Sequence, residues 1–150
     1  MIALAQLINR IRSLLGAFAW LPPLAARIIV GWVFVESGWG KLHHIDKVIG
    51  FFTSLGLPAP SFQAHLVATT EFAGGLALLI GLFTRLASIP LMVIMFVAIA
   101  TAKKDDLHGF SDLIGFPEFL YMALLFWLLI AGPGKVALDA WVASRLKRLD

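Results

Sequence analysis

The sequence contains no cysteine, and only 14% of its 150 residues are charged. The absence of cysteine excludes disulfides, thiolate metal sites, cysteine-ligated iron–sulfur clusters and CxxC redox motifs. Any redox chemistry therefore needs a bound cofactor or a partner that carries the electrons. With 60% hydrophobic residues and a mean hydropathy of +0.91, the chain has too little polar surface for a soluble globule. The composition indicates a single-domain integral membrane protein.

Four segments are long and apolar enough to cross the roughly 30 Å hydrocarbon core of a membrane as helices. They cover residues 22–41, 65–84, 86–103 and 115–132. The second and third are so close that they must form a tight antiparallel hairpin, with Arg85 at its turn. After the first, we expect a short surface helix over residues 46–55. An extended stretch follows it, because Pro58 and Pro60 break a continuous helix.

Both ends of the chain are predicted to form amphipathic helices in the membrane interface, over residues 2–18 and 136–148. A cleaved signal peptide is the alternative for the first of these, because Ala17 and Ala19 match the A-x-A pattern of a cleavage site. Arg10 and Arg12 interrupt its apolar core, which favours the interfacial helix.

Lysine and arginine are distributed unevenly between the two sides of the predicted spans. One side holds Arg10, Arg12, Arg85, Lys135, Arg145, Lys147 and Arg148; the other holds Lys41, Lys47, Lys103 and Lys104. The positive-inside rule then predicts that both termini lie in the cytoplasm.

Ionisable groups at membrane depth are candidates for function because they are costly to bury there. Three glutamates qualify, Glu36, Glu71 and Glu118, and the topology brings all three toward the outer face. The same layer collects all four histidines of the chain, His43, His44, His65 and His108. Together with the glutamates they are weak candidates for a metal site, since no compact motif such as HExxH is present.

Helical geometry divides the first span into two faces. One stripe contains Trp32, Glu36, Gly40 and His43, and the opposite stripe contains Arg27, Gly31, Gly38 and Lys41. Arg27 therefore cannot pair with Glu36. We expect Lys41 or a residue of another helix to neutralise Glu36, and we expect Glu36 to face the layer shared by Glu71 and Glu118.

The other two glutamates also have structural explanations. Glu71 shares a helix face with Gly74 and Gly75, whose small size allows close helix packing, so it is predicted to point into a helix contact. Glu118 follows Pro117, a residue favoured at the first helical position, and can serve the free amide groups at a helix N-terminus.

Several motifs occur together in one order. They are Arg27-x3-Gly31-x2-Phe34-x3-Gly38-x-Gly40-Lys41-Leu42, then LGLPAP (55–60), EFAGGLALLIGLFTRLAS (71–88) and AGPGKVALD (131–139). With this order and spacing, the chain resembles the DoxX family of small bacterial inner-membrane proteins from about Leu24 to Asp139. The family pattern falls on Arg27, Gly38, Lys41, Pro58, Glu71, Gly74, Gly75, Gly81, Arg85 and Asp139.

The resemblance implies an all-α, four-helix transmembrane bundle, in agreement with the four spans. It also implies a link to membrane oxidoreductase assemblies and oxidative-stress defence, since the family is similar to a small subunit of thiosulfate:quinone oxidoreductases. Arg85 and Asp139, two positions of the pattern on the cytoplasmic side, are expected to form a salt bridge near Arg27.

Three functions remain open from the sequence. The first is a redox-linked subunit that binds a quinone or another small lipophilic ligand in an outer pocket. Its proton-exchanging groups are Glu36, Glu71 and Glu118, and its ligand contacts are Lys41, Tyr121, Trp32 and His108. The second is a non-catalytic module that assembles a partner membrane or periplasmic protein, and the third is metal handling. Pairing with a second copy through glycine faces is also open, whereas the terminal position of the basic residues argues against nucleic acid.

Overall fold

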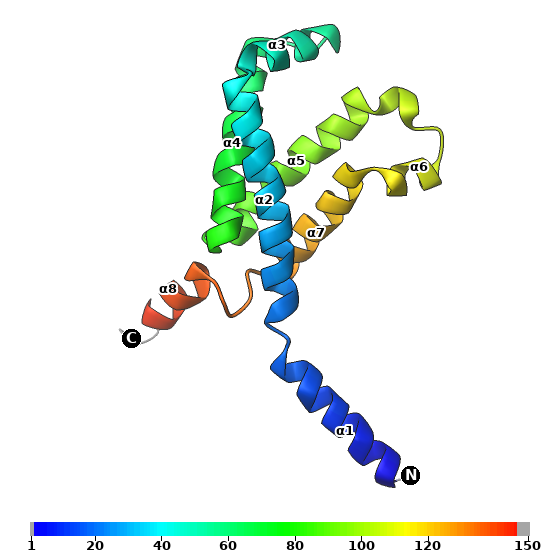
Figure 1. Ribbon diagram of the computed structural model, residues 1–150, viewed down its shortest axis with the longest axis vertical. Helices are drawn as coiled ribbons and strands as arrows, with labels where there is room; N and C mark the ends of the chain where they lie inside the picture. Colours follow the sequence, from blue (N-terminus) through cyan, green and yellow to red (C-terminus); the bar gives the residue numbers. More distant parts are fainter. Residues whose placement is uncertain (1, 147–150) are drawn as a thin grey trace.

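The computed structural model describes residues 2–146, and within this range it consists of helices joined by short links, without strands (Figure 1). Four core helices form its centre: α2 (Leu21–His43), α4 (Pro60–Ile80), α5 (Thr84–Ala102) and α7 (Pro117–Ala131). Shorter elements flank them: α1 (Ile2–Ala17), α3 (Ile45–Ser54), the 3-10 turn η1 (Lys104–Asp106), α6 (Phe110–Gly115) and α8 (Leu138–Leu146). Residues 147 and 148 of the predicted C-terminal helix lie outside the described residues.

Proline and glycine set the ends of the core helices. Pro60 and Pro117 each occupy the first turn of a helix, where proline's fixed φ is favourable and its missing N–H is not needed. Phe116 is held extended by the proline after it, so the fourth core helix begins at Pro117 rather than at residue 115 as expected. Gly81, with φ of 70°, ends α4 in the left-handed conformation and allows the tight turn into α5.

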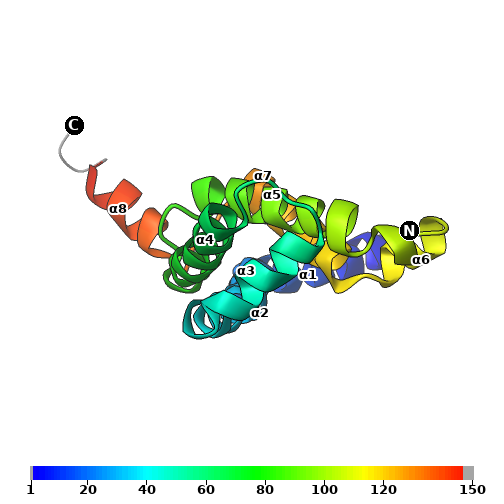
Figure 2. The same cartoon turned by 90° about the horizontal axis from the view of Figure 1, so that it is seen from above.

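The core helices pack as two pairs. α2 lies against α4 and α5 lies against α7, and the contacts between the pairs are fewer. Figure 1 shows the pairs close together where α4 turns into α5 and diverging toward α3 and α6. We call the first of these the hairpin end and the second the open end. Seen from above, α3 extends from α2 at the open end, where it packs on α4 (Figure 2).

Glycines allow the backbones of α2 and α4 to touch. A Cβ at Gly38 would lie 2.8 Å from the Cα of Phe72, and one at Gly75 would lie 2.7 Å from the backbone nitrogen of Val35. Gly74 faces a different neighbour, since its Cβ would lie 3.1 Å from the Leu91 side chain of α5. The two adjacent glycines of α4 therefore serve two separate helix contacts.

Polar contacts to the segment after α7 stabilise the hairpin end. The Asp139 carboxylate accepts hydrogen bonds from the backbone N–H groups of Phe83, at 2.8 Å, and Thr84, at 3.1 Å. Arg27, only 1% exposed, donates to the carbonyl oxygen of Val136. The expected Arg85–Asp139 salt bridge is wrong: Arg85 instead donates to the carbonyl oxygen of Ile130, at 3.2 Å. The Asp139 carboxylate oxygens instead accept hydrogen bonds from the backbone amides at the start of α5, which have no acceptor within the helix.

By length and composition, two helical stretches of the described chain are suited to cross a membrane. They are Gln6–His43, which contains α2, and Thr84–Ala102, which is α5. α7 is apolar but has 15 residues, which at 1.5 Å per residue is about 22 Å. Both α1 and α8 leave from the hairpin end, and α1 projects away from the other helices (Figure 1). The two helices α1 and α8 therefore lie on the same side of the four core helices.

Candidate functional site

A cavity of about 970 Å³ lies between the two helix pairs, with walls from α2, α3, α4, α5 and α7. Most of its lining is apolar, including Phe51 and Phe52 of α3 and Val93 of α5. Its polar lining residues are Ser37, Lys41, Lys47, Gln63, Thr70, Glu71, Thr101, Lys103, Glu118 and Tyr121. The cavity has the form of a ligand pocket, with apolar walls and a small number of polar groups.

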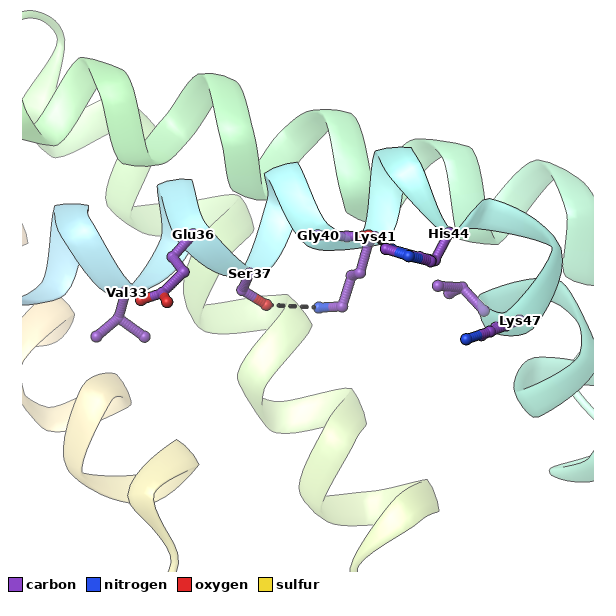
Figure 3. Close-up of a pocket in the computed structure, with 8 residues that line it drawn as sticks. Val33, Glu36, Ser37, Gly40, Lys41, His44 and Lys47 are labelled. Carbon is purple, nitrogen blue, oxygen red and sulfur yellow. Dashed lines mark hydrogen bonds between the residues drawn. The ribbon is translucent and has the colours of Figure 1, made fainter.

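Glu71, Lys41 and Ser37 form a closed polar network on one wall. The Lys41 Nζ donates to both carboxylate oxygens of Glu71, at 2.5 Å for Oε1. It also donates to the Ser37 Oγ at 3.1 Å, and that hydroxyl donates to Glu71 Oε2 at 2.9 Å. Because Ser37 and Lys41 are four residues apart, they lie on the same face of α2 and point toward one another (Figure 3).

This network solves the problem of burying a carboxylate between helices. Glu71 is 1% exposed, whereas Lys41 is 29% exposed and borders the cavity. A buried charge is tolerated only when it is paired and hydrogen-bonded, and here both carboxylate oxygens have donors. The prediction that Glu71 points into a helix contact agrees with this position, and its partner is the lysine that had been expected to neutralise Glu36.

Glu118 and Tyr121 come from the opposite helix pair. They are three residues apart in α7 and both line the cavity. No side-chain hydrogen bond caps the start of α7, so the expected bond from a free backbone amide to the Glu118 carboxylate is not seen. Its Oε2 atom is buried and has no hydrogen-bond partner among the described residues. One oxygen of Glu118 is therefore enclosed without a hydrogen bond from the described residues.

Glu36 does not join the other two glutamates. It is exposed and borders a smaller, open hollow of about 470 Å³ along α2 with Ser37, Gly40 and His44 (Figure 3). It makes no salt bridge with Lys41, which is committed to Glu71. The expectation that Glu36 faces the shared layer is wrong, because the stripe of α2 that packs on α4 is the opposite one, with Gly31 and Gly38.

Two expected ligand contacts also lie elsewhere. Trp32 is 61% exposed on the outer side of α2. His108 is exposed in the link before α6, where its backbone N–H donates to Asp112. Neither lines the cavity, whereas Lys41 and Tyr121 do. Trp32 lies among the exposed residues of α2 and not on the face with Gly31 and Gly38 that packs on α4, and His108 lies in the link between η1 and α6.

The histidines are dispersed in the structure. The Nδ1 atoms of His43, His44 and His65 each bond to a backbone carbonyl four residues earlier, in α2 for the first two and in α4 for His65. Within residues 2–146, no group of three or more histidine, aspartate or glutamate side chains is arranged to hold a metal. The weak metal candidates from the sequence are therefore not brought together.

Ser37 is the site residue that sequence reasoning missed. It lies one turn before Lys41, on the stripe next to the small residues Gly31 and Gly38. A serine at that spacing from a lysine inside an apolar span is a signal for a buried polar contact. The contribution of α3 to the cavity, through Val48, Phe51 and Phe52, was not expected either.

Comparisons with known proteins agree with the motifs. A family model described as DoxX matches residues 23–104. An uncharacterised membrane protein of Mycobacterium tuberculosis is 34% identical over 137 residues, covering 83% of this chain and 84% of its own. The proposed oxidoreductase CatD of Bacillus subtilis is 34% identical over 79% of this chain and 85% of its own.

A third relative is named the inner membrane protein YqjF of Escherichia coli, 28% identical over 77% of this chain and 88% of its own. No solved structure matches the chain. The motifs, the all-helical fold and the relatives lead to one assignment: this chain belongs to the DoxX family of membrane proteins.

Proposed function

We propose that this protein is a redox-linked subunit of the bacterial inner membrane that binds a quinone-type ligand in the cavity between its two helix pairs. The observation that carries the proposal is the cavity itself, an apolar chamber with ionisable groups from both pairs in its walls. A relative that bears the name of an oxidoreductase supports the redox link. In this proposal α2, α4, α5 and α7 are the four spans, and both termini lie in the cytoplasm.

The cavity suits such a ligand in size and chemistry. At about 970 Å³ it lies near the upper end of the range of small-molecule pockets. The walls from α3 and α5 offer an apolar surface for a lipid-like tail. Tyr121 and Glu118 offer a hydroxyl and a carboxylate to a ring that carries oxygen atoms, and such groups can also exchange protons with it.

The protein's own role is then to bind and orient the ligand and to hold protons near it. Because the sequence has no cysteine, the electrons must come from a partner or from another bound group. The Lys41–Glu71 pair keeps a positive charge at the cavity wall without leaving the carboxylate unpaired. We therefore place this chain beside a partner that performs the electron transfer.

A cavity-filling substitution tests the proposal most directly. Ala98 lines the cavity on α5, and Ala100, two residues further, is exposed and does not line it. Ala98→Trp is expected to abolish binding of a decyl-tailed benzoquinone, measured by calorimetry on protein in detergent micelles. Ala100→Trp is the matched control and is expected to bind as the unmodified protein does. Equal binding by both variants, or no binding by the unmodified protein, would refute the proposal.

A second candidate function rests on Glu36. This carboxylate is exposed on the unpacked face of α2, seven residues before the helix ends, so it lies about 10 Å below that end. A charge at this depth in lipid requires a partner. A membrane protein with a basic or hydroxyl side chain at the same depth would supply it. Loss of a co-purifying membrane partner in Glu36→Leu, but not in Asp46→Leu on α3, would favour this assembly role.

A further inference from the structure

Two lysines of the cavity wall have no anionic partner within the described part of the chain. Lys47 on α3 and Lys103, directly after α5, both line the cavity. Neither ammonium group makes a hydrogen bond or a salt bridge to a described residue, whereas Lys41 is paired with Glu71. The Lys103 Nζ lies 5.8 Å from the centre of the Phe116 ring, and this cation–π contact leaves its charge unneutralised. The cavity therefore presents two ammonium groups with donors to spare.

The lining of the cavity carries more positive than negative charge. Its lysine and glutamate side chains are Lys41, Lys47, Lys103, Glu71 and Glu118, and it contains no other acidic, arginine or histidine side chain from the described residues. The lysines outnumber the glutamates even when both glutamates are ionised, and protonation of Glu118 would only increase the excess. Because Glu71 is bonded to Lys41, the excess lies with the other two lysines. A negatively charged ligand would balance it.

These two lysines lie at one end of a long apolar wall. On α5 the lining extends from Ile89 to Lys103, fourteen positions or about 21 Å along the helix. Its members from Ile89 to Ala98 are all apolar, and Thr101 and Lys103 follow at the open end. Helix α3, which carries Lys47, also lies at this end (Figures 1 and 2). A hydrocarbon core of roughly 30 Å holds two acyl chains end to end, so this wall has room for one chain and a head group.

We infer that the cavity binds a single-chain anionic amphiphile, with its oxyanion head group at Lys47 and Lys103 and its apolar chain directed toward the hairpin end. A carboxylate or a phosphate supplies both the negative charge and the hydrogen-bond acceptors that the two ammonium groups lack. A neutral quinone supplies acceptors but no charge. The inference therefore goes beyond the proposed function, because it assigns a second ligand class to the cavity and does not require quinone binding.

The test compares three radiolabelled probes that share one alkyl chain: hexadecanoate, hexadecyl phosphate and neutral hexadecanol. Their binding to the full-length protein in detergent micelles is measured by scintillation proximity at about pH 8.5, where lysines keep their charge. We expect at least one anion to bind about tenfold or more tightly than hexadecanol, because charge-assisted hydrogen bonds are stronger than neutral ones. The tighter anion identifies the head group as a carboxylate or a phosphate. Equal binding of all three probes, or no binding, would overturn the inference.

Substitutions test whether the two lysines select the anion. The double variant Lys47→Met with Lys103→Met is expected to bind the preferred anion no more tightly than hexadecanol. Lys104→Met is the matched control, because Lys104 is exposed, follows Lys103 and does not line the cavity. Lys47→Arg with Lys103→Arg keeps both charges and is expected to retain most of the binding. An equal loss in the Lys104→Met control would contradict the assignment to Lys47 and Lys103.

A measurement on the unmodified protein does not depend on how any variant folds. Raising the salt concentration from about 0.1 M to about 1 M shortens the Debye length from about 10 Å to about 3 Å. The preference for the anion over hexadecanol is then expected to fall several-fold. An unchanged preference would show that charge does not select the ligand. None of the probes is a quinone, so failure of the inference would leave the proposed function standing, and failure of quinone binding would leave the inference standing.

Discussion

Gly38 offers a sharp test of the packing that positions the site. A Cβ at this position would lie 2.8 Å from the Phe72 Cα and 2.9 Å from the Ala68 carbonyl oxygen. The first distance is about 0.6 Å short of ordinary van der Waals contact, which begins at 3.4 Å. Both obstacles are backbone atoms of α4, so no side-chain rotation relieves the clash. Gly38→Ala therefore forces α2 and α4 apart.

The cost follows from two opposing terms. Overpacking a close contact typically costs about 1–3 kcal/mol, whereas alanine in place of glycine in a helix gains about 1 kcal/mol. Gly75 holds the same two helices together further along, which prevents an easy local adjustment. Gly40, two residues from Gly38 on the same helix, has nothing within 4 Å of its Cβ position. Gly40→Ala therefore carries only the favourable term.

Thermal unfolding in detergent, followed by circular dichroism, measures the difference. We expect Gly38→Ala to be about 2 kcal/mol less stable than Gly40→Ala, or about 4–8 °C in Tm for a chain of this length. We also expect Gly38→Ala to weaken quinone binding, because Lys41 and Glu71 lie across the same helix contact. Equal stability of the two alanine variants would show that α2 and α4 do not touch through their backbones near Phe72.

Three further predictions concern the charged residues. Lys41→Met should lower the free energy of unfolding by about 3 kcal/mol, because it leaves the buried Glu71 carboxylate with only the Ser37 hydroxyl as a donor. The double variant with Glu71→Leu should recover most of this loss, measured by thermal unfolding. Asp139→Ala should lower the free energy of unfolding by about 1–2 kcal/mol, because it removes two hydrogen bonds to backbone amides. A change near zero would contradict this role of Asp139. Arg85→Ala should cost less than about 1 kcal/mol and be additive with Asp139→Ala, whereas a salt bridge between them would make the double variant non-additive.

Most of the fold could be predicted from the sequence, because apolar segments and the prolines and glycines at helix ends are local features of the chain. The four apolar segments locate the core helices to within about five residues. The largest difference is at α4, which begins at Pro60 and not at residue 65, because Pro60 starts the helix and does not merely interrupt it. The expected hairpin and the short helix after the first span are both present. The turn, however, covers residues 81–83, so Arg85 lies in the first turn of α5 and not at the hairpin turn as expected. The divergence of the helix pairs could not be predicted, because it depends on which faces of different helices meet.

The candidate site was predicted only in part, because the wrong face of α2 was expected to point toward it. Glu36 was expected to join Glu71 and Glu118, yet Lys41 occupies that position. The sequence held the signal: Gly31 and Gly38 lie on the stripe of Lys41, and small residues mark the face that packs. The same argument had been applied to Gly74 and Gly75 in α4, where it identified a packed face. The orphaned oxygen of Glu118 depends on side-chain geometry and has no sequence signature.

The divergence of the two helix pairs has a consequence for how the proposed quinone-type ligand would reach the cavity. Leu66 of α4 and Ile89 and Val93 of α5 line the cavity and are also exposed apolar side chains. If the cavity binds the quinone-type ligand proposed above, these side chains would let a hydrophobic molecule dissolved among the lipids enter sideways without passing through water. Occupancy would then follow the mole fraction of the ligand in the bilayer, where quinones are concentrated. Even modest intrinsic affinity would suffice to keep such a site filled, and the composition of the membrane would set how often it is.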